Sequence, residues 1–326
     1  MLINSKNFIQ IDTKDKITIA DSFVVRSNKL GSGNGEGKLY IGNEGEVLRN
    51  FYGPKGFKIK CFLLKQDLLK FLNDLKAEYI FPQLPYKKKE DLPSLFSSRS
   101  NKIQSLPEVL EFSIDEQVQI QGPRVYINSK DKNYQFLREI PLPDLSYISL
   151  MKLIANDGEI IYYIKLFADF KDSFGVTSHP STVQKEEALL EQNISLSKEV
   201  KLQTVKARIG QGKYRKQLLE QCPFCPVTLV SDDRLLIASH IKPWAVSNQN
   251  EKIDPKNGFM FTPTIDYLFD SGFISFEDNK KMLVSPWLSK PTISRLNIKP
   301  LKVIDHLPIF GREKYLQYHR ESIFKN

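Results

Sequence analysis

Cysteine is scarce in this sequence: its 326 residues include only Cys61, Cys222 and Cys225. So few cysteines exclude a disulfide-stabilised scaffold and fit a reducing compartment such as the cytoplasm. Apolar runs long enough to cross a bilayer are also lacking, and the N-terminal segment MLINSKNFIQIDTKDK has no apolar region of the secretory type. We therefore expect a cytoplasmic protein that is neither secreted nor embedded in a membrane.

The composition is that of an ordinary globular protein, with 41% hydrophobic and 26% charged residues. The length is more than twice that of a usual single domain, which predicts two domains. The net charge is +9, and residues 201–326 hold most of the excess, with 20 basic and 12 acidic side chains. A basic segment of this kind indicates nucleic acid as a partner, although the same charge can serve solubility alone.

The chain predicts an α+β protein in which two domains are joined by a connector. Residues 1–172 mix short apolar runs with stretches of helical spacing, residues 173–206 predict a helical connector, and residues 207–326 form the second domain. In the first domain we expect strands over 17–25, 57–63, 118–121 and 160–167, and helices over 65–75 and 145–155.

A glycine-rich stretch, GSGNGEGK, occupies residues 31–38. A phosphate-binding loop requires glycine at the position of Ser32 and serine or threonine at the position of Leu39. The stretch fails both requirements, so we predict a loop between two strands and no nucleotide cofactor.

In the second domain, Thr262 is the expected N-cap of a short helix, Pro263 its first residue, and Gly272 lies just past its end. Asp266 and Asp270 are four residues apart, so their carboxylates stack on one side of this helix. Two stacked carboxylates repel each other unless a cation or water separates them, and oxygen ligands of this kind suit Mg²⁺. The alternative is a pair of solvated surface aspartates.

His240 is the one histidine of four that ends an apolar strand. A neutral imidazole near pH 7 can take a proton from water, as phosphodiester hydrolysis requires. Asn257 can hydrogen-bond backbone carbonyls and so brace the loop that presents His240. Each residue taken alone has another reading, because a histidine at a strand end is often structural and Asn-Gly is a common turn.

These residues occur within a longer pattern, which comprises Arg208-Ile-Gly-Gln211, Tyr214-Arg215, Leu218-Leu219, Ala238-Ser-His-Ile-Lys-Pro-Trp244, Asn257-Gly258 and Asp266-Tyr-Leu-Phe-Asp-Ser-Gly-Phe-Ile274. With this pattern, residues 208–288 resemble the HNH (ββα-metal) nucleases, in particular the subgroup found in bacterial restriction endonucleases. The resemblance implies a ββα-metal fold for the C-terminal domain, followed by a helical extension. It also implies metal-assisted hydrolysis of phosphodiester bonds with a single Mg²⁺, which Mn²⁺ can replace.

The same resemblance implies a role for each residue of the site. His240 activates water, Asn257 holds the loop, Asp266 binds the metal, and Asp270 is a second metal contact in some members. The sequence departs from the family in two ways. Ser239 stands where many members have an acidic or histidine metal ligand, and Asp266 stands where histidine or asparagine is usual.

Double-stranded DNA is the expected substrate, and its phosphates need cationic contacts. We expect these contacts from four side chains: Arg208, Lys213, Arg215 and Lys242.

Cys222 and Cys225 form one lone CxxC pair, and no cysteine follows them. A zinc site would need distant histidines such as His306 or His319, so structural zinc is not expected and two buried thiols are the default.

The sequence thus favours a restriction-type DNA endonuclease, in which residues 1–172 select a plain sequence or a modified base and the HNH domain cuts. The alternative is a DNA-binding protein whose HNH module does not cleave. Because one HNH site cuts one strand, we also expect a homodimer. Its candidate surfaces are residues 183–200 and 312–324, although either segment could instead pack on its own core.

Overall fold

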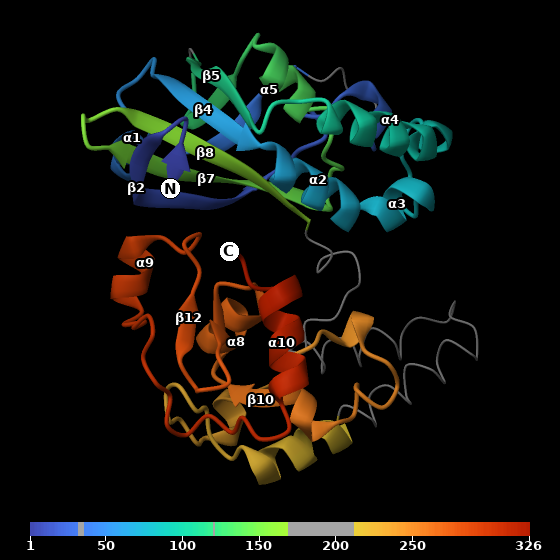
Figure 1. Ribbon diagram of the computed structural model, residues 1–326, viewed down its shortest axis with the longest axis vertical. Coiled ribbons are helices and arrows are strands. Elements are labelled where there is room, and N and C mark those ends of the chain that lie inside the picture. Colours follow the sequence, from blue (N-terminus) through green and yellow to red (C-terminus); the bar gives the residue numbers. More distant parts are fainter. Residues whose placement is uncertain (32–35, 120, 169–211) are drawn as a thin grey trace. The chain divides into compact units, whose positions relative to one another are not determined.

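The computed structural model describes residues 1–31, 36–119, 121–168 and 212–326 (Figure 1). The chain divides into two compact units, Met1–Gly175 and Val176–Asn326. The connector predicted over residues 173–206 lies outside the described residues. None of the helices in the described part of the chain is long and apolar enough to cross a membrane.

An eight-stranded sheet organises the first unit, in the order β1-β2-β7-β8-β4-β5-β6-β3. Neighbouring strands are antiparallel except β4 and β8, which run parallel. The strands are β1 (Leu2–Ile3), β2 (Lys6–Thr18), β3 (Leu39–Asn43), β4 (Lys58–Leu64), β5 (Val109–Gln117), β6 (Arg124–Asn128), β7 (Ser146–Ala155) and β8 (Ile160–Ala168).

The helices of the first unit are α1 (Glu46–Tyr52), α2 (Lys65–Asp74), α3 (Lys76–Ile80), α4 (Leu92–Gln104) and α5 (Lys132–Leu137), with short 3₁₀ helices at Arg26–Asn28 and Lys89–Asp91. Helices α2, α3 and α4 contact one another and gather at one end of the sheet (Figure 1). A single cluster of buried apolar side chains joins these helices to the sheet.

Three elements predicted for the first unit are confirmed, namely the strands over 57–63 and 160–167 and the helix over 65–75. The strand expected over 17–25 ends at Thr18. β5 ends at Gln117, and of the strand expected over 118–121 the described residues 118, 119 and 121 are not in a strand. The glycine-rich stretch lies partly outside the described residues.

The helix predicted over residues 145–155 is wrong, since this segment forms strand β7. β7 pairs with β2 on one side and β8 on the other, and eight of its ten residues are buried. A strand covered on both faces has an almost continuous apolar pattern, which periodicity alone does not separate from that of a buried helix.

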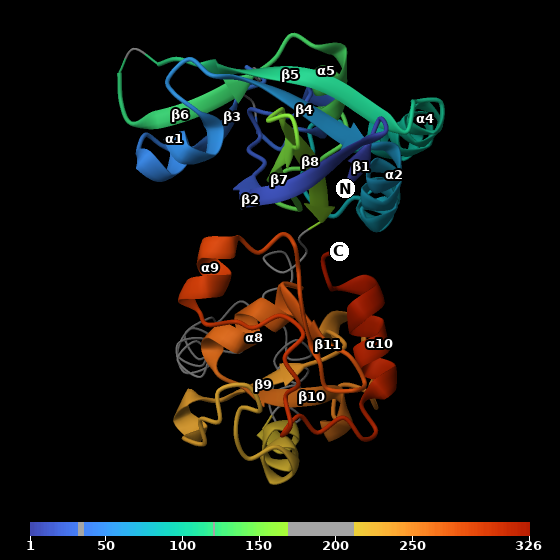
Figure 2. The ribbon, with the colours of Figure 1, turned by 60° about the vertical axis from the view of Figure 1, so that its left-hand side comes forward.

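The second unit contains a helix over residues 212–221 and short elements that follow it. These are β9 (Ile237–His240), β10 (Gly258–Phe261), α8 (Pro263–Asp270), β11 (Ile274–Phe276), β12 (Met282–Val284), α9 (Lys290–Arg295) and α10 (Glu313–Ser322), with 3₁₀ helices at Asp233–Leu235, Trp244–Val246 and Pro255–Asn257. Strands β9 and β10 are antiparallel, and α8 contacts both (Figure 2). Mixed helices and strands, with a ββα arrangement in the C-terminal region, confirm the predicted fold class.

The core of the second unit is rich in phenylalanine. Phe259, Phe261, Phe269 and Phe276 are fully buried, and their rings contact one another. The ring of His319 on α10 stacks on Phe269, with 3.8 Å between centroids.

Helix α10 is thereby anchored in the core of its own unit. Tyr315, Leu316 and His319, which belong to the candidate dimer surface of residues 312–324, are all buried within the chain. The other candidate surface, residues 183–200, lies outside the described residues.

Candidate active site

His240 is the last residue of β9 and lies opposite Gly258, the first residue of β10. The chain then passes through Thr262 into α8, whose first residue is Pro263. Proline suits this position because it has no N–H to leave unpaired in the first turn. In the ββα unit of β9, β10 and α8 (Figure 2), His240 therefore lies on a strand and Asp270 on the adjoining helix.

The imidazole of His240 is enclosed on several sides. The ring of Tyr214 stacks on it with 4.2 Å between centroids and 12° between planes. The indole of Trp244 meets the imidazole edge to face, with 5.6 Å between ring centroids. Nε2 of His240 lies 3.1 Å from the carbonyl oxygen of Lys252. A carbonyl oxygen only accepts hydrogen bonds, so Nε2 carries the proton and Nδ1 keeps its lone pair. In this tautomer Nδ1 can act as a base.

Burial lowers the pKa of His240 below its ordinary value of 6.5. The hydrogen bond to the Lys252 carbonyl and the charge of Asp270 oppose this shift, but desolvation is the larger effect. The imidazole is therefore neutral near pH 7, the form that a general base requires.

Asn257 is completely buried, and both ends of its side-chain amide are used. Its Oδ1 accepts a hydrogen bond from the backbone N–H of Lys242 at 2.8 Å. Its Nδ2 donates to the carbonyls of Lys242 at 3.2 Å and Glu251 at 3.1 Å. Asn257 thus ties together the two ends of the loop between β9 and β10, the same loop whose Lys252 carbonyl orients His240.

Asp266 and Asp270 lie one turn apart on α8, the first half-buried and the second exposed. Within the described part of the chain, no three side chains of histidine, cysteine, aspartate or glutamate are grouped as a metal cage. Mg²⁺ needs no such cage, because it keeps several waters and binds through one or two carboxylates plus substrate phosphates. Two carboxylates on one side of a helix are hard oxygen donors, and they therefore fit a hard divalent cation.

Ser239, which precedes His240 in β9, is buried. Successive side chains of a strand point to opposite faces, so Ser239 and His240 point away from each other.

The four basic residues predicted to contact phosphate have different surroundings. Lys213 is exposed, whereas Arg208 lies outside the described residues. Arg215 donates to the carbonyls of Leu236 at 2.8 Å and Asp233 at 2.6 Å. These bonds brace the start of β9, so contact with DNA would require Arg215 to exchange partners.

Lys242 is also engaged within the protein. Its ammonium forms an ion pair with Glu251 at 2.7 Å, and this pair lowers the pKa of the Glu251 carboxyl. Binding of a phosphate by Lys242 would therefore compete with Glu251.

Cys222 and Cys225 are buried free thiols. Cys222 donates to the carbonyl of Phe224 at 3.3 Å, and burial raises its pKa. Of the two histidines considered as zinc partners, His319 has both ring nitrogens in hydrogen bonds. Nδ1 bonds to the hydroxyl of Ser275 at 2.9 Å, and Nε2 to the carbonyl of Phe269 at 3.0 Å.

Sequence reasoning missed the residues that orient the base and close its loop. Tyr214 was noticed only as part of the family pattern, and the contributions of Lys252 and Glu251 are made by main-chain carbonyls, which any residue could supply. The signal for Tyr214 is Gly258, since a Cβ at that position would lie 1.9 Å from the tyrosine hydroxyl.

The ββα unit, with His240 on its strand and two carboxylates on its helix, is similar to that of the HNH nucleases. In agreement, residues 222–277 match the sequence profile of the HNH endonuclease family. No curated protein matches the chain. The matched segment is thus an HNH nuclease domain, which suggests endonuclease activity on DNA, and nucleases of this class generally use a divalent metal.

Proposed function

We propose that the protein is a metal-dependent DNA endonuclease in which His240 is the general base. The observation that carries this proposal is the orientation of the His240 ring, with Nε2 hydrogen-bonded to the Lys252 carbonyl and Nδ1 free of that bond. A lowered pKa keeps this ring neutral at physiological pH. Proton transfer to Nδ1 turns a water molecule into a hydroxide-like nucleophile that attacks a DNA phosphate.

Asp266 and Asp270 would hold the metal, which we propose to be Mg²⁺, with Mn²⁺ as a substitute. When bound, a divalent metal supplies positive charge that stabilises the charge developing on the phosphate and the leaving oxygen. Asp270 has a second effect, because its negative charge favours the protonated form of His240. It therefore helps the imidazole to keep the proton that it has taken from water.

A plasmid assay tests this proposal. The purified protein is incubated with supercoiled plasmid and Mg²⁺ or Mn²⁺, and a parallel reaction contains EDTA. We expect nicked or linear DNA with either metal and intact plasmid with EDTA. DNA binding without cleavage under any metal would instead support a DNA-binding protein whose HNH module does not cut.

We further propose that cleavage is of the restriction type, with the unit of residues 1–172 selecting the target. Support comes from the separate compact unit that precedes the HNH domain and has its own core. Sequencing the ends cut from methylated and unmethylated genomic DNA tests this role. A shared motif at the ends is expected, whereas random ends would contradict target selection.

Cutting both strands at one target needs two active sites, and we propose a homodimer on the DNA. Light scattering of the DNA-bound protein tests this assembly. A stable complex of one protein with one DNA that cuts both strands at once would contradict it.

A further inference from the structure

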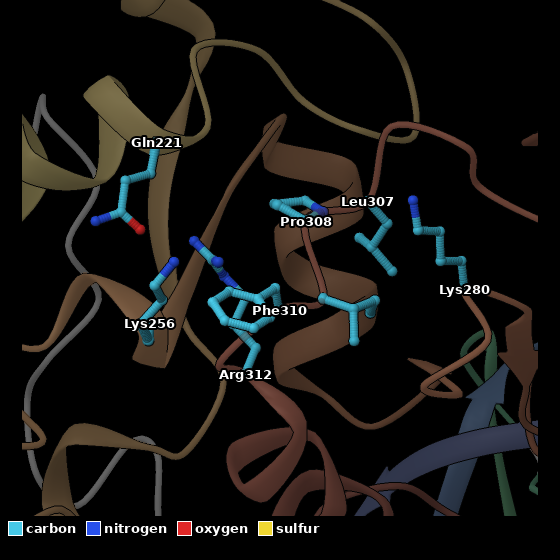
Figure 3. Close-up of a pocket in the computed structure, with 8 residues that line it drawn as sticks. Gln221, Lys256, Lys280, Leu307, Pro308, Phe310 and Arg312 are labelled. Atoms are coloured by element: carbon cyan, nitrogen blue, oxygen red, sulfur yellow. The ribbon is translucent and has the colours of Figure 1, made fainter.

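A pocket of about 450 Å³ lies in the second unit and includes none of the site residues described above. Its polar lining is contributed by Gln221, Lys256, Lys280 and Arg312, while Phe310 and its neighbours add apolar surface (Figure 3). Ligand sites of small molecules commonly occupy about 300–1,000 Å³, so this volume accommodates a nucleotide.

The charge of the pocket is of one sign. Three of its eight lining residues are cationic and none is acidic. Charges of one sign that line the same cavity repel each other, so an anion bound there relieves the repulsion. The pocket therefore favours a negatively charged ligand.

Arg312 is a buried cation that the main chain holds in place. Only 1% of its surface is exposed, yet the partners of its guanidinium are the neutral carbonyls of Gly258 at 2.9 Å and Pro255 at 3.3 Å. Among the described residues, no carboxylate forms an ion pair with it. Burial lowers the pKa of Arg312 from its usual value, and the charges of Asp254 and Glu313, neither of which is a paired counterion, only partly oppose this shift. A phosphate in the pocket would supply that counterion, and the planar guanidinium suits it.

The position of Lys256 is set by its neighbour Gly311. A Cβ at Gly311, where φ is +79°, would lie 3.3 Å from Cδ of Lys256, so glycine leaves room for the lysine stem. The ammonium of Lys256 lies 5.8 Å from the ring centre of Phe310. Lys280 is a further cation of the lining, and it donates to the carbonyl of Asp305 at 2.8 Å.

Phe310 adds an aromatic surface to this cationic pocket. Its side chain is 85% exposed although the residue belongs to a well-packed domain. An exposed aromatic ring beside cations is the combination with which proteins bind single-stranded nucleic acid, because the ring stacks on a base and the cations hold the phosphate. Only an unpaired base offers its face for such stacking.

We propose that this pocket binds an unpaired nucleic acid strand, with Lys256 and Arg312 on the phosphate of one nucleotide, Phe310 on its base and Lys280 on a neighbouring phosphate. The assignment of the ligand as DNA rests on the proposed endonuclease function. A hydrogen bond connects the pocket to the active site. Arg312 donates to the carbonyl of Gly258, and Gly258 lies opposite His240 in the β9–β10 pair. A nucleic acid strand held there would be anchored to the β9–β10 hairpin, which carries His240.

The test measures binding in EDTA, so that it does not depend on cleavage. Fluorescence anisotropy follows a labelled single-stranded oligonucleotide and a labelled duplex over a range of salt concentrations. The variants are Lys256→Gln, Lys280→Gln and Phe310→Ala, and Lys299→Gln, an exposed lysine outside the pocket, is the matched control. Thermal melting verifies that each variant is folded.

For the single strand, each pocket lysine variant should lower the slope of log K against log salt concentration by about 0.7, the value for one phosphate contact. Phe310→Ala should weaken binding roughly 5- to 100-fold, the effect of losing one stacked base. Competition by dAMP that is lost in the same variants would identify free nucleotide as a ligand of the same chemistry. Pocket variants that bind the single strand like Lys299→Gln, or that lose only duplex binding, would overturn the proposal while leaving the nuclease function untouched.

Discussion

The aromatic ring of Tyr214 lies parallel to the imidazole of His240, at 4.2 Å between centroids. Its hydroxyl donates to the carbonyl oxygen of Asn257 at 3.0 Å. One side chain from the helix of residues 212–221 therefore covers the face of the base and braces the residue that closes the loop. The absence of a side chain at Gly258 provides the space for this contact.

Two substitutions of Tyr214 separate these two contacts. Tyr214→Phe keeps the ring but loses the hydrogen bond, and should cost about 1 kcal/mol of stability with cleavage within a few-fold of wild type. Tyr214→Leu also removes the stack and exposes His240 to water, so the pKa of His240 should rise toward its ordinary value. Thermal melting and NMR titration of the histidines measure both effects. An unchanged pKa in Tyr214→Leu would show that the tyrosine does not shield the imidazole.

His240→Ala should reduce cleavage by about 10²–10⁴-fold while DNA binding in EDTA stays close to wild type, because the general base is lost and the fold is not. His306→Ala is the control, since His306 is exposed and outside the ββα unit. Plasmid cleavage rates and anisotropy measure the two properties. Retention of more than about a tenth of the activity in His240→Ala would mean that another group is the base.

The acidic limb of the pH–rate profile should lie below pH 6.5, since burial lowers the pKa of His240 from that value. Cleavage is lost as the pH falls through this pKa, because the protonated imidazole no longer accepts a proton. The negative charge of Asp270 opposes the shift, so Asp270→Asn should lower the His240 pKa further in the metal-free protein. NMR titration without metal measures this change, and a rise in the pKa would contradict the assignment.

Asp266 and Asp270 should differ in their importance for the metal. Asp266→Ala should remove activity at every Mg²⁺ concentration, whereas Asp270→Ala should mainly raise the Mg²⁺ concentration that half-maximal cleavage requires. Rates measured over a Mg²⁺ series compare the two variants. Equal and complete rescue of both by excess metal would show that neither is the principal contact.

Asn257→Ala should lower the free energy of unfolding by about 1–3 kcal/mol, because it leaves partly buried backbone groups of Lys242 and Glu251 without partners. Asn250→Ala is the control, since Asn250 is exposed in the same loop. Chemical denaturation compares the two variants. Equal stability losses would contradict the special role of Asn257.

Local sequence signals correctly predicted the elements that carry the site. The helix that begins at Pro263 after Thr262 is found as expected. The strand expected over residues 118–121 is not found at its described residues, since β5 ends at Gln117. Such short apolar segments pair only where a neighbouring strand is available, which local sequence does not reveal.

The sequence by itself determined that His240 ends a strand and that Asp266 and Asp270 share one side of a helix, because both follow from the fixed geometry of strands and helices. Only the tertiary structure decided which nitrogen of His240 carries the proton, since that depends on a carbonyl presented by the loop. The engagement of Lys242 by Glu251 and the burial of Arg312 against the carbonyl of Gly258 were likewise decided by packing. These contacts join residues far apart along the chain or depend on the path of a loop, and neither is encoded by the spacing of residue types.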